Sequence, residues 1–570
     1  MTTTSAAATA SAGPAGADDR ELRAAEAAGV ALDNAGLAVL QTIRAYGVDT
    51  VFGIPGTHNL EFYRHLPRLG IRAVTSRHEQ GAGYAADGWA QRTGMPGVVI
   101  TTSGPGLLNA LSAAGTAYCE SRPLIILSPG VARGAEFADV GTLHETKDAT
   151  AASGAIVEWS RRVGSAAEAV EAVHDAFRLF RTGRPRPVHI ELPLDVLEGA
   201  ADVPASDREA RPAPPLVTAD PEGVARAARI LADATHPVIV AGGGATRAGA
   251  ALTALAERLG APVVTTLNGK GTVPESHPLS VGAELRLAAA QELVNGSDGV
   301  LIVGAKIGEA ELWGGVIAPT GPVVRVDILE SQGQKNVAGD VVLVGHAEAV
   351  VPQLSLAIGE APAGPGRPGA RCDVDAVRAL CAEQAGAFGE TTDTAARRIA
   401  AVLPSDAIVA GDSSQITYLG MASAVRQDEP HAFLYTPAYA TLGYGLPAAI
   451  GAAVAESARG SEARPVVAVV GDGALMFAVQ ELATAVEQGV DLTVVCYDNG
   501  GYGEIEQNEA DRGIAPIGVR LTQPDWPALA DAFGARGWPV RRLEDLEVVL
   551  REAQSAPGVN LVHVPARHFG

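Results

Sequence analysis

The stretch that most constrains the fold lies in the last third of the chain, where two apolar segments enclose a helix. Residues 466–470 are all apolar and mostly β-branched, and the run is too short to span a membrane, so it predicts a buried parallel strand. A Gly-Asp-Gly turn, apolar residues at helical spacing over 474–488 and a second apolar run at 492–497 follow. This order predicts a βαβ unit whose crossover brings the two strands together. We therefore expect Asp472 and Asn499 to end neighbouring strands at the carboxyl edge of the sheet, where open α/β sheets bind ligands.

The residue types at this edge suit a hard cation bound to phosphate. Asp472 supplies a carboxylate, Asn499 an amide oxygen and the loop after it a backbone carbonyl, with no thiol or imidazole among them. Such oxygens are ligands of Mg²⁺ or Ca²⁺, and Mg²⁺ leaves positions for phosphate oxygens. The helix expected after Gly473 would direct free N–H groups and the positive end of its dipole to the same place. Gly-Asp-Gly alone is equally compatible with a plain strand-turn-helix corner, and only its pairing with Asn499 favours the cation site.

Two stretches rich in Pro, Gly and Ala, at 200–218 and 361–370, divide the 570 residues into three units. Each unit alternates apolar strands with helices and ends its strands in Gly-rich turns, which predicts an α/β fold of three doubly wound parallel-sheet domains. The first and third units share one architecture, as a duplicated fold would. The expected bounds are 1–31 for a disordered tail, then 32–199, 219–360 and 391–570 for the domains.

Composition excludes several classes of partner. The net charge of −22 argues against nucleic acid and anionic membranes. No apolar stretch reaches membrane-spanning length, and the first residues lack the pattern of a signal peptide. The four cysteines show no metal-binding spacing and are typical of buried thiols in a reducing compartment. We therefore expect a cytoplasmic protein that acts on a small molecule.

GDG followed by DNGG resembles the metal-diphosphate motif of thiamine diphosphate enzymes. The segments RHEQGAGYAADGWA, TSGPGLLNAL, TPAYATLGYGLPAAIGA and DNGGYGEI resemble the acetohydroxyacid synthase and 2-oxo acid decarboxylase branch of that family, and within it most of all the 5-guanidino-2-oxopentanoate decarboxylases. The resemblance covers almost the whole chain after the tail. It implies a pyrimidine-binding, a central and a diphosphate-binding domain, with thiamine diphosphate and Mg²⁺ as cofactors. It also implies that the cofactor lies between subunits, so that a homodimer is the minimum and a homotetramer is expected.

The resemblance assigns the central catalytic role to Glu79. This carboxyl group would bond the pyrimidine ring nitrogen of the cofactor and so promote deprotonation of the thiazolium carbon. Burial raises a carboxyl pKa toward such a role. Taken alone, Glu79 is equally compatible with an ordinary glutamate in the first turn of a helix.

The same resemblance implies the remaining contacts of the cofactor. Leu442 would wedge between the two cofactor rings, and the carbonyl of Ala440 would accept a hydrogen bond from the amino group. Asp472, Asn499 and the backbone oxygen of Gly501 would be the metal ligands. The other implied cofactor-binding residues are Pro55, Gly56, Ser103, Gly106, Asn109, Ser414, Gln415, Gly471, Gly473, Ala474 and Tyr502.

The residues on the substrate side are Thr57, His58, His144, Glu504 and Ile505. The first three are candidate catalytic residues, although a lone histidine in a loop is as often a solvated or packing residue. Glu504 and Ile505 are expected to contact the substrate. The carboxylate of Glu504 could pair with a cationic tail such as a guanidinium group, and a plain surface glutamate is the equal alternative.

Two departures from the family pattern bear on the reaction. Ile505 stands where pyruvate decarboxylases carry the glutamate that promotes product release, which weakens an assignment to simple pyruvate decarboxylation. Residues 283–286 and 306–310 differ from the segments that serve FAD in the synthases, which puts FAD binding in doubt; Glu309 and Glu311 beside them could instead line a pocket for a basic substrate.

The expected reaction is the non-oxidative decarboxylation of a 2-oxo acid, through an enamine, to an aldehyde. The substrate could be a basic acid such as 5-guanidino-2-oxopentanoate. Carboligation of the enamine to a second carbonyl compound and C–C hydrolysis are alternatives. A silent, non-enzymatic paralogue is disfavoured because Glu79, Asp472 and Asn499 are all present.

Overall fold

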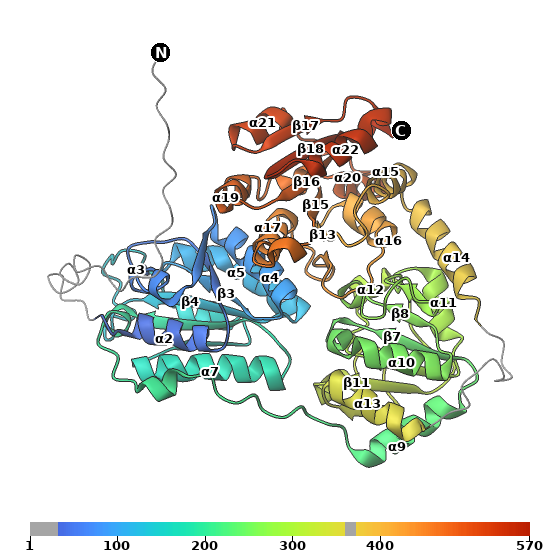
Figure 1. The fold of residues 1–570 in the computed structure, drawn as a ribbon, viewed down its shortest axis with the longest axis horizontal. Helices are drawn as coiled ribbons and strands as arrows, with labels where there is room; N and C mark the ends of the chain where they lie inside the picture. The colour runs from blue at the N-terminus through green and yellow to red at the C-terminus, as the bar shows by residue number, and fades with distance from the viewer. Residues whose placement is uncertain (1–31, 360–371, 570) are drawn as a thin grey trace.

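The computed structural model describes residues 32–359 and 372–569, and these form three parallel sheets of six strands each (Figure 1). The first sheet (blue to teal) and the central sheet (green to yellow) lie side by side below the third (orange to red). The prediction of an α/β fold with three parallel-sheet units is confirmed. The tail expected at 1–31 and the whole second linker at 361–370 lie outside the described residues.

The first and third sheets have the same strand order, second-first-third-fourth-sixth-fifth along the chain. The strands of the first are β1 (Thr50–Gly53), β2 (Arg72–Thr75), β3 (Gly97–Ile100), β4 (Leu124–Gly130), β5 (Trp159–Arg162) and β6 (Val188–Pro193). Those of the third are β13 (Ile408–Gly411), β14 (Phe433–Leu434), β15 (Val466–Gly471), β16 (Leu492–Asp498), β17 (Arg536–Pro539) and β18 (Val559–Pro565). The shared order agrees with the architecture expected from the sequence for these two units.

The helices of these two units follow their strands. Those of the first are α2 (Ala35–Ala45), α3 (Leu60–Tyr63), α4 (Glu79–Thr93), α5 (Pro105–Glu120), α6 (Ala149–Gly154), α7 (Ala166–Thr182) and α8 (Leu194–Leu197). Those of the third are α15 (Glu390–Ala400), a π-helix η6 (Ile416–Met421), α16 (Ala422–Ala424), α17 (Gly445–Ser457), α18 (Asp472–Leu475), α19 (Glu481–Gln488), α20 (Gly503–Asp511), α21 (Trp526–Ala532) and α22 (Leu546–Ser555).

The central sheet has a different order, β12-β11-β10-β7-β8-β9. Its strands are β7 (Pro237–Ala241), β8 (Val263–Thr265), β9 (Ser280–Gly282), β10 (Gly299–Val303), β11 (Val323–Asp327) and β12 (Val341–Val344). Its helices are α9 (Pro221–Asp233), α10 (Gly249–Leu259), α11 (Ala288–Asn295), α12 (Glu309–Leu312) and α13 (Ala347–Ile358), and α14 (Val374–Ala387) leads into the third unit.

Helices α4 and α17 pack directly against each other and join the first unit to the third (Figure 1). Small residues make the close approach possible. A Cβ on Gly88 would lie 2.1 Å from the Ala448 carbonyl oxygen, and one on Gly451 would lie 1.8 Å from that of Ala85. One apolar core consequently runs through both units, whereas the central unit has cores of its own.

The helix expected over 474–488 is divided in the structure. Residues 472–475 form the single turn α18, residues 476–480 form turns, and α19 begins at Glu481. The Glu481 carboxylate accepts the backbone N–H groups of Arg77 and His78 at the start of α4, at 3.0 Å each. The turns orient α19 so that these N–H groups, which have no partner within their own helix, are satisfied.

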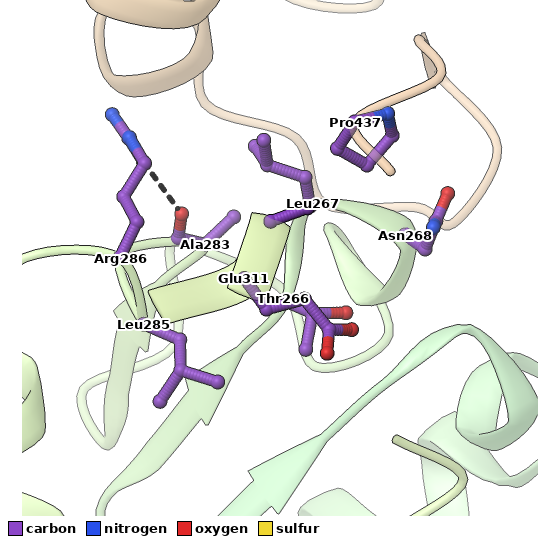
Figure 2. A pocket seen from close by; sticks show the side chains of 9 residues that line it. Thr266, Leu267, Asn268, Ala283, Leu285, Arg286, Glu311 and Pro437 are labelled. Carbon is purple, nitrogen blue, oxygen red and sulfur yellow. Dashed lines mark hydrogen bonds between the residues drawn. The ribbon is translucent and has the colours of Figure 1, made fainter. Parts of the chain in front are cut away.

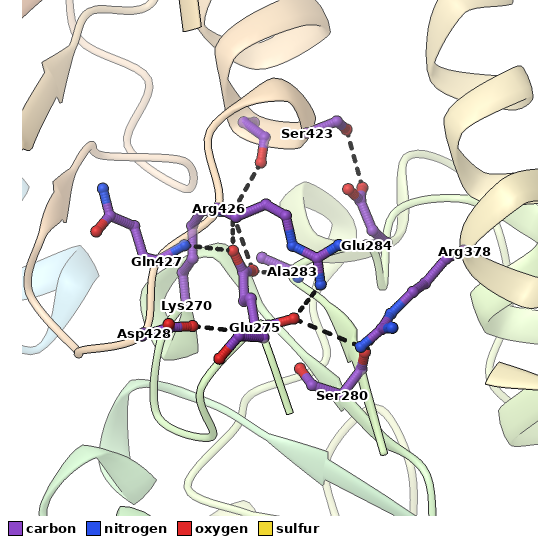
Figure 3. A network of polar contacts seen from close by, with 12 residues as sticks. Lys270, Glu275, Ser280, Ala283, Glu284, Arg378, Ser423, Arg426, Gln427 and Asp428 are labelled. Atoms are coloured by element: carbon purple, nitrogen blue, oxygen red, sulfur yellow. Dashed lines mark hydrogen bonds and ion pairs between the residues drawn. The ribbon is translucent and has the colours of Figure 1, made fainter. Parts of the chain in front are cut away.

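A buried ion pair connects the central unit to the third (Figure 3). Lys270 Nζ donates to Glu275 Oε1 over 2.9 Å, and both side chains are 3% exposed. The other carboxylate oxygen accepts the Gln427 backbone N–H at 2.7 Å, while Arg378 and Arg426 donate to the Glu275 backbone oxygen. Glu275 is therefore bonded from both sides of the junction.

Replacing Lys270 with Met is expected to lower the free energy of unfolding by about 3 kcal/mol, because it leaves the Glu275 carboxylate buried without its cation. Urea denaturation of the variant and the wild type measures the difference. Lys335→Met is the control, since Lys335 is exposed. A loss below about 1 kcal/mol, the range of exposed ion pairs, would contradict a structural role for the pair.

Within the described residues, no helix combines the length and the apolar character needed to cross a membrane.

Candidate functional site

The carboxyl ends of β15 and β16 bring the predicted metal ligands together. The two strands are parallel neighbours, with Gly471 opposite Tyr497. Asp472 follows the first strand and Asn499 the second, and the backbone N–H of Asn499 lies 3.4 Å from Asp472 Oδ1. The adjacency expected from the βαβ pattern is confirmed.

Three oxygen-bearing groups, the Asp472 carboxylate, the Asn499 amide and the Gly501 carbonyl, converge at this point. One atom of the Asn499 amide lies 3.0 Å from both Asp472 Oδ1 and the Gly501 carbonyl oxygen. With its nitrogen there the amide donates to both; with its oxygen there, three oxygens face one another as ligands around a cation do. Oxygens bound at right angles to Mg²⁺ at about 2.1 Å are about 3.0 Å apart. The spacing therefore fits Mg²⁺.

Asp472 itself lacks a compensating charge. It is 0% exposed, and its Oδ2 has no hydrogen-bond partner. Burial, followed by the neighbouring carboxylate of Asp498, raises the pKa of Asp472 to about 6. A divalent cation would offset both effects. Among the described residues no three His, Cys, Asp or Glu side chains cluster to hold a metal, so a cation here depends on the amide and the carbonyl as well.

The predicted diphosphate contacts surround this point. Ser414 Oγ accepts the Gly471 N–H at 3.1 Å, and a Cβ on Gly473 would lie 2.9 Å from the Tyr502 ring. Ala474 continues the single turn α18. Because α18 is one turn and not the long helix expected, backbone N–H groups are available here but the dipole of a long helix is not.

The predicted wedge lies on a strained segment. Ala440 has a φ of 51°, unusual for a residue with a side chain, and Leu442 is half-buried two residues later. The N–H groups of Gly443 and Gly445 donate to the two oxygens of Asp412, at 3.0 and 2.8 Å. Burial raises the pKa of Asp412 to about 6. The sequence analysis did not single out Asp412, although its place directly after a strand, as in Asp472, was a usable signal.

Glu79 is a buried acidic residue of the first unit. It begins α4, is 8% exposed, and its Oε2 accepts a hydrogen bond from Asn109 Nδ2 at 3.0 Å. A Cβ on Gly106 would lie 3.0 Å from the other carboxylate oxygen. The glycine therefore leaves room beside an acidic side chain that a ligand could approach. Pro55 and Gly56 lie in the loop after β1, and the Gly56 N–H donates to Asn59 Oδ1.

Two histidines from distant loops meet at one serine. His58 Nδ1 lies 2.6 Å and His144 Nδ1 3.4 Å from Ser103 Oγ, and the two rings are edge to face at 5.2 Å. Burial, and then the proximity of His144, lowers the pKa of His58. Thr57, the neighbour of His58, is exposed. The structure thus brings His58, His144 and Ser103 together.

Glu504 is held in place although it is exposed. Its Oε2 accepts hydrogen bonds from Gln415 Nε2 at 3.2 Å and from the Tyr418 hydroxyl at 3.1 Å. Gln415 also approaches Gly503, where an added Cβ would lie 2.8 Å from its Oε1 and 2.6 Å from Asn499 Nδ2. Glu504 therefore adjoins the metal and diphosphate residues.

Two neighbours complete the surroundings of Glu504. Tyr418 lies in the π-helix η6, and burial raises its pKa, with Glu504 as the next cause. Sequence reasoning missed Tyr418, because a π-helix has no pattern that distinguishes it from an α-helix. Ile505 is 51% exposed.

Within the described chain the predicted site residues form two separate groups, one around Glu79 in the first unit and one around Asp472 in the third. No hydrogen bond or ion pair between described residues joins the Glu79 group to the Asp472 group. Large apolar side chains stay exposed on the segments that carry both groups: Leu108, Met476, Phe477 and Ile505.

A separate cavity lies between the central and third units (Figure 2). It measures about 10 Å³, room for no more than about one water molecule, and is lined by Thr266, Leu267, Asn268, Ala283, Leu285, Arg286, Ala310, Glu311 and Pro437. Arg286 is paired with Glu284, and Glu311 accepts the Gly308 N–H. The doubt about FAD binding, which arose from these segments, stays a prediction.

Comparisons with known proteins agree over most of the chain. Residues 33–152 match the N-terminal TPP binding domain of thiamine pyrophosphate enzymes, 224–354 the central domain and 415–564 the C-terminal TPP binding domain. A probable 2-ketoarginine decarboxylase of Pseudomonas aeruginosa, AruI, is 38% identical over 538 residues, which cover 93% of each chain. A probable acetolactate synthase large subunit of Methanocaldococcus jannaschii is 30% identical over 90% of this chain and 89% of its own. An X-ray structure from Mycobacterium smegmatis, described as thiamin diphosphate-dependent, superposes with a TM-score of 0.77 at 27% identity and covers 93% of this chain and 99% of that one.

Proposed function

Because this chain belongs to the thiamine pyrophosphate enzyme family, we propose that it is a thiamine diphosphate- and Mg²⁺-dependent carboxy-lyase that converts a basic 2-oxo acid, such as 5-guanidino-2-oxopentanoate, to CO₂ and an aldehyde. The observation that carries the proposal is the convergence of Asp472 Oδ1, the Asn499 amide and the Gly501 carbonyl, while the other oxygen of the buried Asp472 carboxylate, Oδ2, has no hydrogen-bond partner. The similarity to a probable 2-ketoarginine decarboxylase supports the reaction and the substrate class.

The chain's own residues would bind and orient the cofactor. When bound, thiamine diphosphate supplies the sink for the electrons released as the carboxyl group leaves. Asp472, Asn499 and Gly501 would hold Mg²⁺ against the diphosphate. Glu79 would hold a proton at the pyrimidine ring nitrogen, and Leu442 would keep the two rings bent toward each other.

His58, Ser103 and His144 are placed to move a proton on the substrate side. The lowered pKa of His58 leaves its ring neutral near pH 7, which suits a group that accepts a proton and passes it on. With Ser103 Oγ between the two imidazoles, a proton can travel from one ring to the other. We propose that this pathway supplies the proton that completes the aldehyde.

The complete site requires a second copy of the chain. Glu79 and Asp472 belong to groups that no bond between described residues joins, and exposed apolar side chains surround both groups. A homodimer would place the Glu79 group of one subunit over the Asp472 group of the other and cover these side chains. We expect two such dimers to form a homotetramer. The small-molecule substrate, the absence of nucleic-acid and membrane partners and the cytoplasmic location stay predictions.

Incubation with thiamine diphosphate, Mg²⁺ and a panel of 2-oxo acids tests the proposed reaction. CO₂ with free aldehyde from 5-guanidino-2-oxopentanoate is the expected result. CO₂ with a hydroxyketone would favour carboligation, the alternative that the similarity to acetolactate synthases supports. An acid product without CO₂ would indicate C–C hydrolysis. A protein that neither retains thiamine diphosphate nor releases CO₂ would refute the proposal.

Replacing Glu504 with Gln is expected to lower kcat/KM for 5-guanidino-2-oxopentanoate by roughly 10- to 100-fold, since a hydrogen bond to a charged group contributes about 1.5–3 kcal/mol. A neutral 2-oxo acid of equal length should lose little, and steady-state kinetics with both acids measures the contrast. Glu506→Gln is the control, because Glu506 lies two residues further along α20 and pairs with Arg520. Equal losses for the two acids would remove Glu504 from substrate recognition.

A further inference from the structure

The segment 436–442 carries two of the predicted cofactor contacts. Side chains of its own unit anchor only the end next to α17. It connects β14 to α17 and includes Ala440 and Leu442. Residues 438–440 are exposed, and Ala440 has a φ of 51°. A positive φ at a residue with a side chain costs energy and persists only where the surroundings enforce it. Within the segment the Ala440 N–H donates to the Thr436 carbonyl at 3.0 Å, and further support comes from outside it.

That support comes from the first unit. Oε1 of Glu120, the last residue of α5, accepts the backbone N–H groups of Ala438 at 2.9 Å and Tyr439 at 3.0 Å. Glu120 is 9% exposed, so these charge-assisted hydrogen bonds are largely shielded from water. Gly115, one turn and a half earlier on α5, lies against the Tyr439 ring: an added Cβ would be 2.5 Å from the hydroxyl oxygen. Helix α5 thus contacts both the backbone and the side chain of the segment.

The carboxylate of Glu120 is itself fixed by the central unit. Asn268 Nδ2 donates to Glu120 Oε2 at 2.7 Å, and Arg122 donates to Asn268 Oδ1 at 3.1 Å and to the Tyr435 carbonyl at 2.6 Å. Asn268 and Pro437 line the same cavity in Figure 2, where the central and third units meet. All three units therefore converge on the start of the segment.

The other end of the segment has a separate anchor. Asp412 accepts the N–H groups of Gly443 and Gly445, and the Tyr84 hydroxyl lies 2.9 Å from Thr441 Oγ1. Ala440 and Leu442 lie between the Glu120 contact and the Asp412 contact. Both contacts are consequently needed to fix the direction of the Ala440 carbonyl and the position of the Leu442 side chain.

We propose that Glu120 is a positioning residue for the cofactor: by binding the N–H groups of Ala438 and Tyr439 it holds the Ala440 carbonyl and Leu442 where a bent thiamine diphosphate requires them. The expected effect on the cofactor rests on the proposed function, whereas the contact between Glu120 and the backbone of Ala438 and Tyr439 does not. Glu120 touches neither cofactor nor substrate. Replacing Glu120 should therefore slow the activation of the cofactor, and it should leave the affinity that the diphosphate contacts provide unchanged.

The contact is tested first without any cofactor. Hydrogen-deuterium exchange of the cofactor-free protein should show protected amides at Ala438 and Tyr439 in the wild type, and exchange at least about tenfold faster in Glu120→Ala, since each lost bond to a charged group is worth about 1.5–3 kcal/mol. The amides of Gly443 and Gly445, held by Asp412, should be unchanged. Glu120→Gln keeps one oxygen for the two N–H groups and should restore most of the protection.

The consequence is tested with thiamine diphosphate and Mg²⁺ bound. In Glu120→Ala, exchange of the cofactor's thiazolium C2 proton, followed by NMR after acid quench, should slow by at least about tenfold. The dissociation constant of thiamine diphosphate should change by less than about threefold, because the metal and diphosphate contacts are intact. Lys306→Met is the matched control: Lys306 donates to the carbonyl of Cys119, next to Glu120, without touching the segment.

Three results would overturn the inference. The amides of Ala438 and Tyr439 could exchange as slowly in Glu120→Ala as in the wild type, or the C2 proton of the cofactor could exchange at the same rate in both. Lys306→Met could also change amide and C2-proton exchange as much as Glu120→Ala does. If Glu120→Ala does not fold, Asn268→Ala takes its place, because it removes the hydrogen bond that supports the Glu120 carboxylate, together with one of the bonds from Arg122; unchanged amide exchange at Ala438 and Tyr439 in that variant would also overturn the inference. A wild-type protein that binds no thiamine diphosphate would refute the proposed function and leave the amide-exchange test standing.

Discussion

Glu79→Gln is expected to lower kcat by about 10³- to 10⁴-fold, the upper range for the loss of a positioned proton-transfer group. Gln is close to Glu in shape and can keep the hydrogen bond from Asn109, which is 3.0 Å long in the structure. It cannot share a proton with the pyrimidine ring nitrogen. Steady-state decarboxylation and C2-proton exchange of the bound cofactor measure the effect, and both should fall together.

The control for Glu79 is Glu61→Gln. Glu61 is also a buried glutamate of the first unit, but it pairs with Arg64 and accepts from Asn34, away from the site. That variant should keep its activity. Turnover by Glu79→Gln within about tenfold of the wild type would remove Glu79 from the proton transfer, and with it the assignment of the first unit to the cofactor's pyrimidine ring.

Asp472→Asn is expected to raise the Mg²⁺ concentration needed for half-maximal activity by at least about 100-fold, because even residues that only support a metal ligand cost 10–100-fold when changed. Retention of thiamine diphosphate through gel filtration should be lost together with metal binding. Removing the metal from the wild type with EDTA should have the same effect, and added Mg²⁺ should reverse it. A variant with wild-type metal dependence would contradict the assignment.

Measuring the stability of the metal-free protein distinguishes a loss of metal binding in Asp472→Asn from misfolding. Asp472 has a folded pKa of about 6 against an ordinary value of 3.8, so above pH 6 its buried charge destabilises the metal-free fold. Asp472→Asn removes that charge and should be at least as stable as the wild type at pH 8. The difference should shrink as the pH falls from about 6 toward 4 and vanish below that, where the wild-type carboxyl is protonated in both the folded and the unfolded state. Thermal unfolding across this range measures it.

The adjacency of Asp472 and Asn499 could be predicted from the sequence because it depends on local pattern. The sequence has a short apolar strand, a Gly-rich turn and a crossover of ordinary length. Such a crossover is right-handed and pairs β15 with β16 in parallel, which brings Asp472 and Asn499 together. The start of the first helix was predictable for the same reason: Asn34 accepts the Leu37 N–H at 3.0 Å, as an N-cap residue does. Features such as a strand pairing across a short crossover and a helix N-cap are determined by the backbone geometry of nearby residues.

The first half of the expected helix over 474–488 shows where local pattern fails. Apolar spacing predicts one helix, but residues 476–480 form turns, and Glu481 bonds to N–H groups at Arg77 and His78. The partners are about 400 positions away in sequence. Periodicity describes the face a helix buries, and it carries no information about a distant helix end that needs an acceptor.

Local sequence pattern was sufficient to predict the three parallel sheets, the convergence of Asp472 and Asn499 and the position of Glu79 at the start of α4, because alternation and turn residues follow from short-range sterics and hydrophobic burial. The folded chain alone reveals that Tyr418 orients Glu504, that Ser103 joins His58 to His144, and that Glu120 holds the Ala438–Tyr439 backbone. These contacts link residues up to 318 positions apart. Their physical reason is that packing of whole domains, and not any local preference, determines which buried polar group finds which partner.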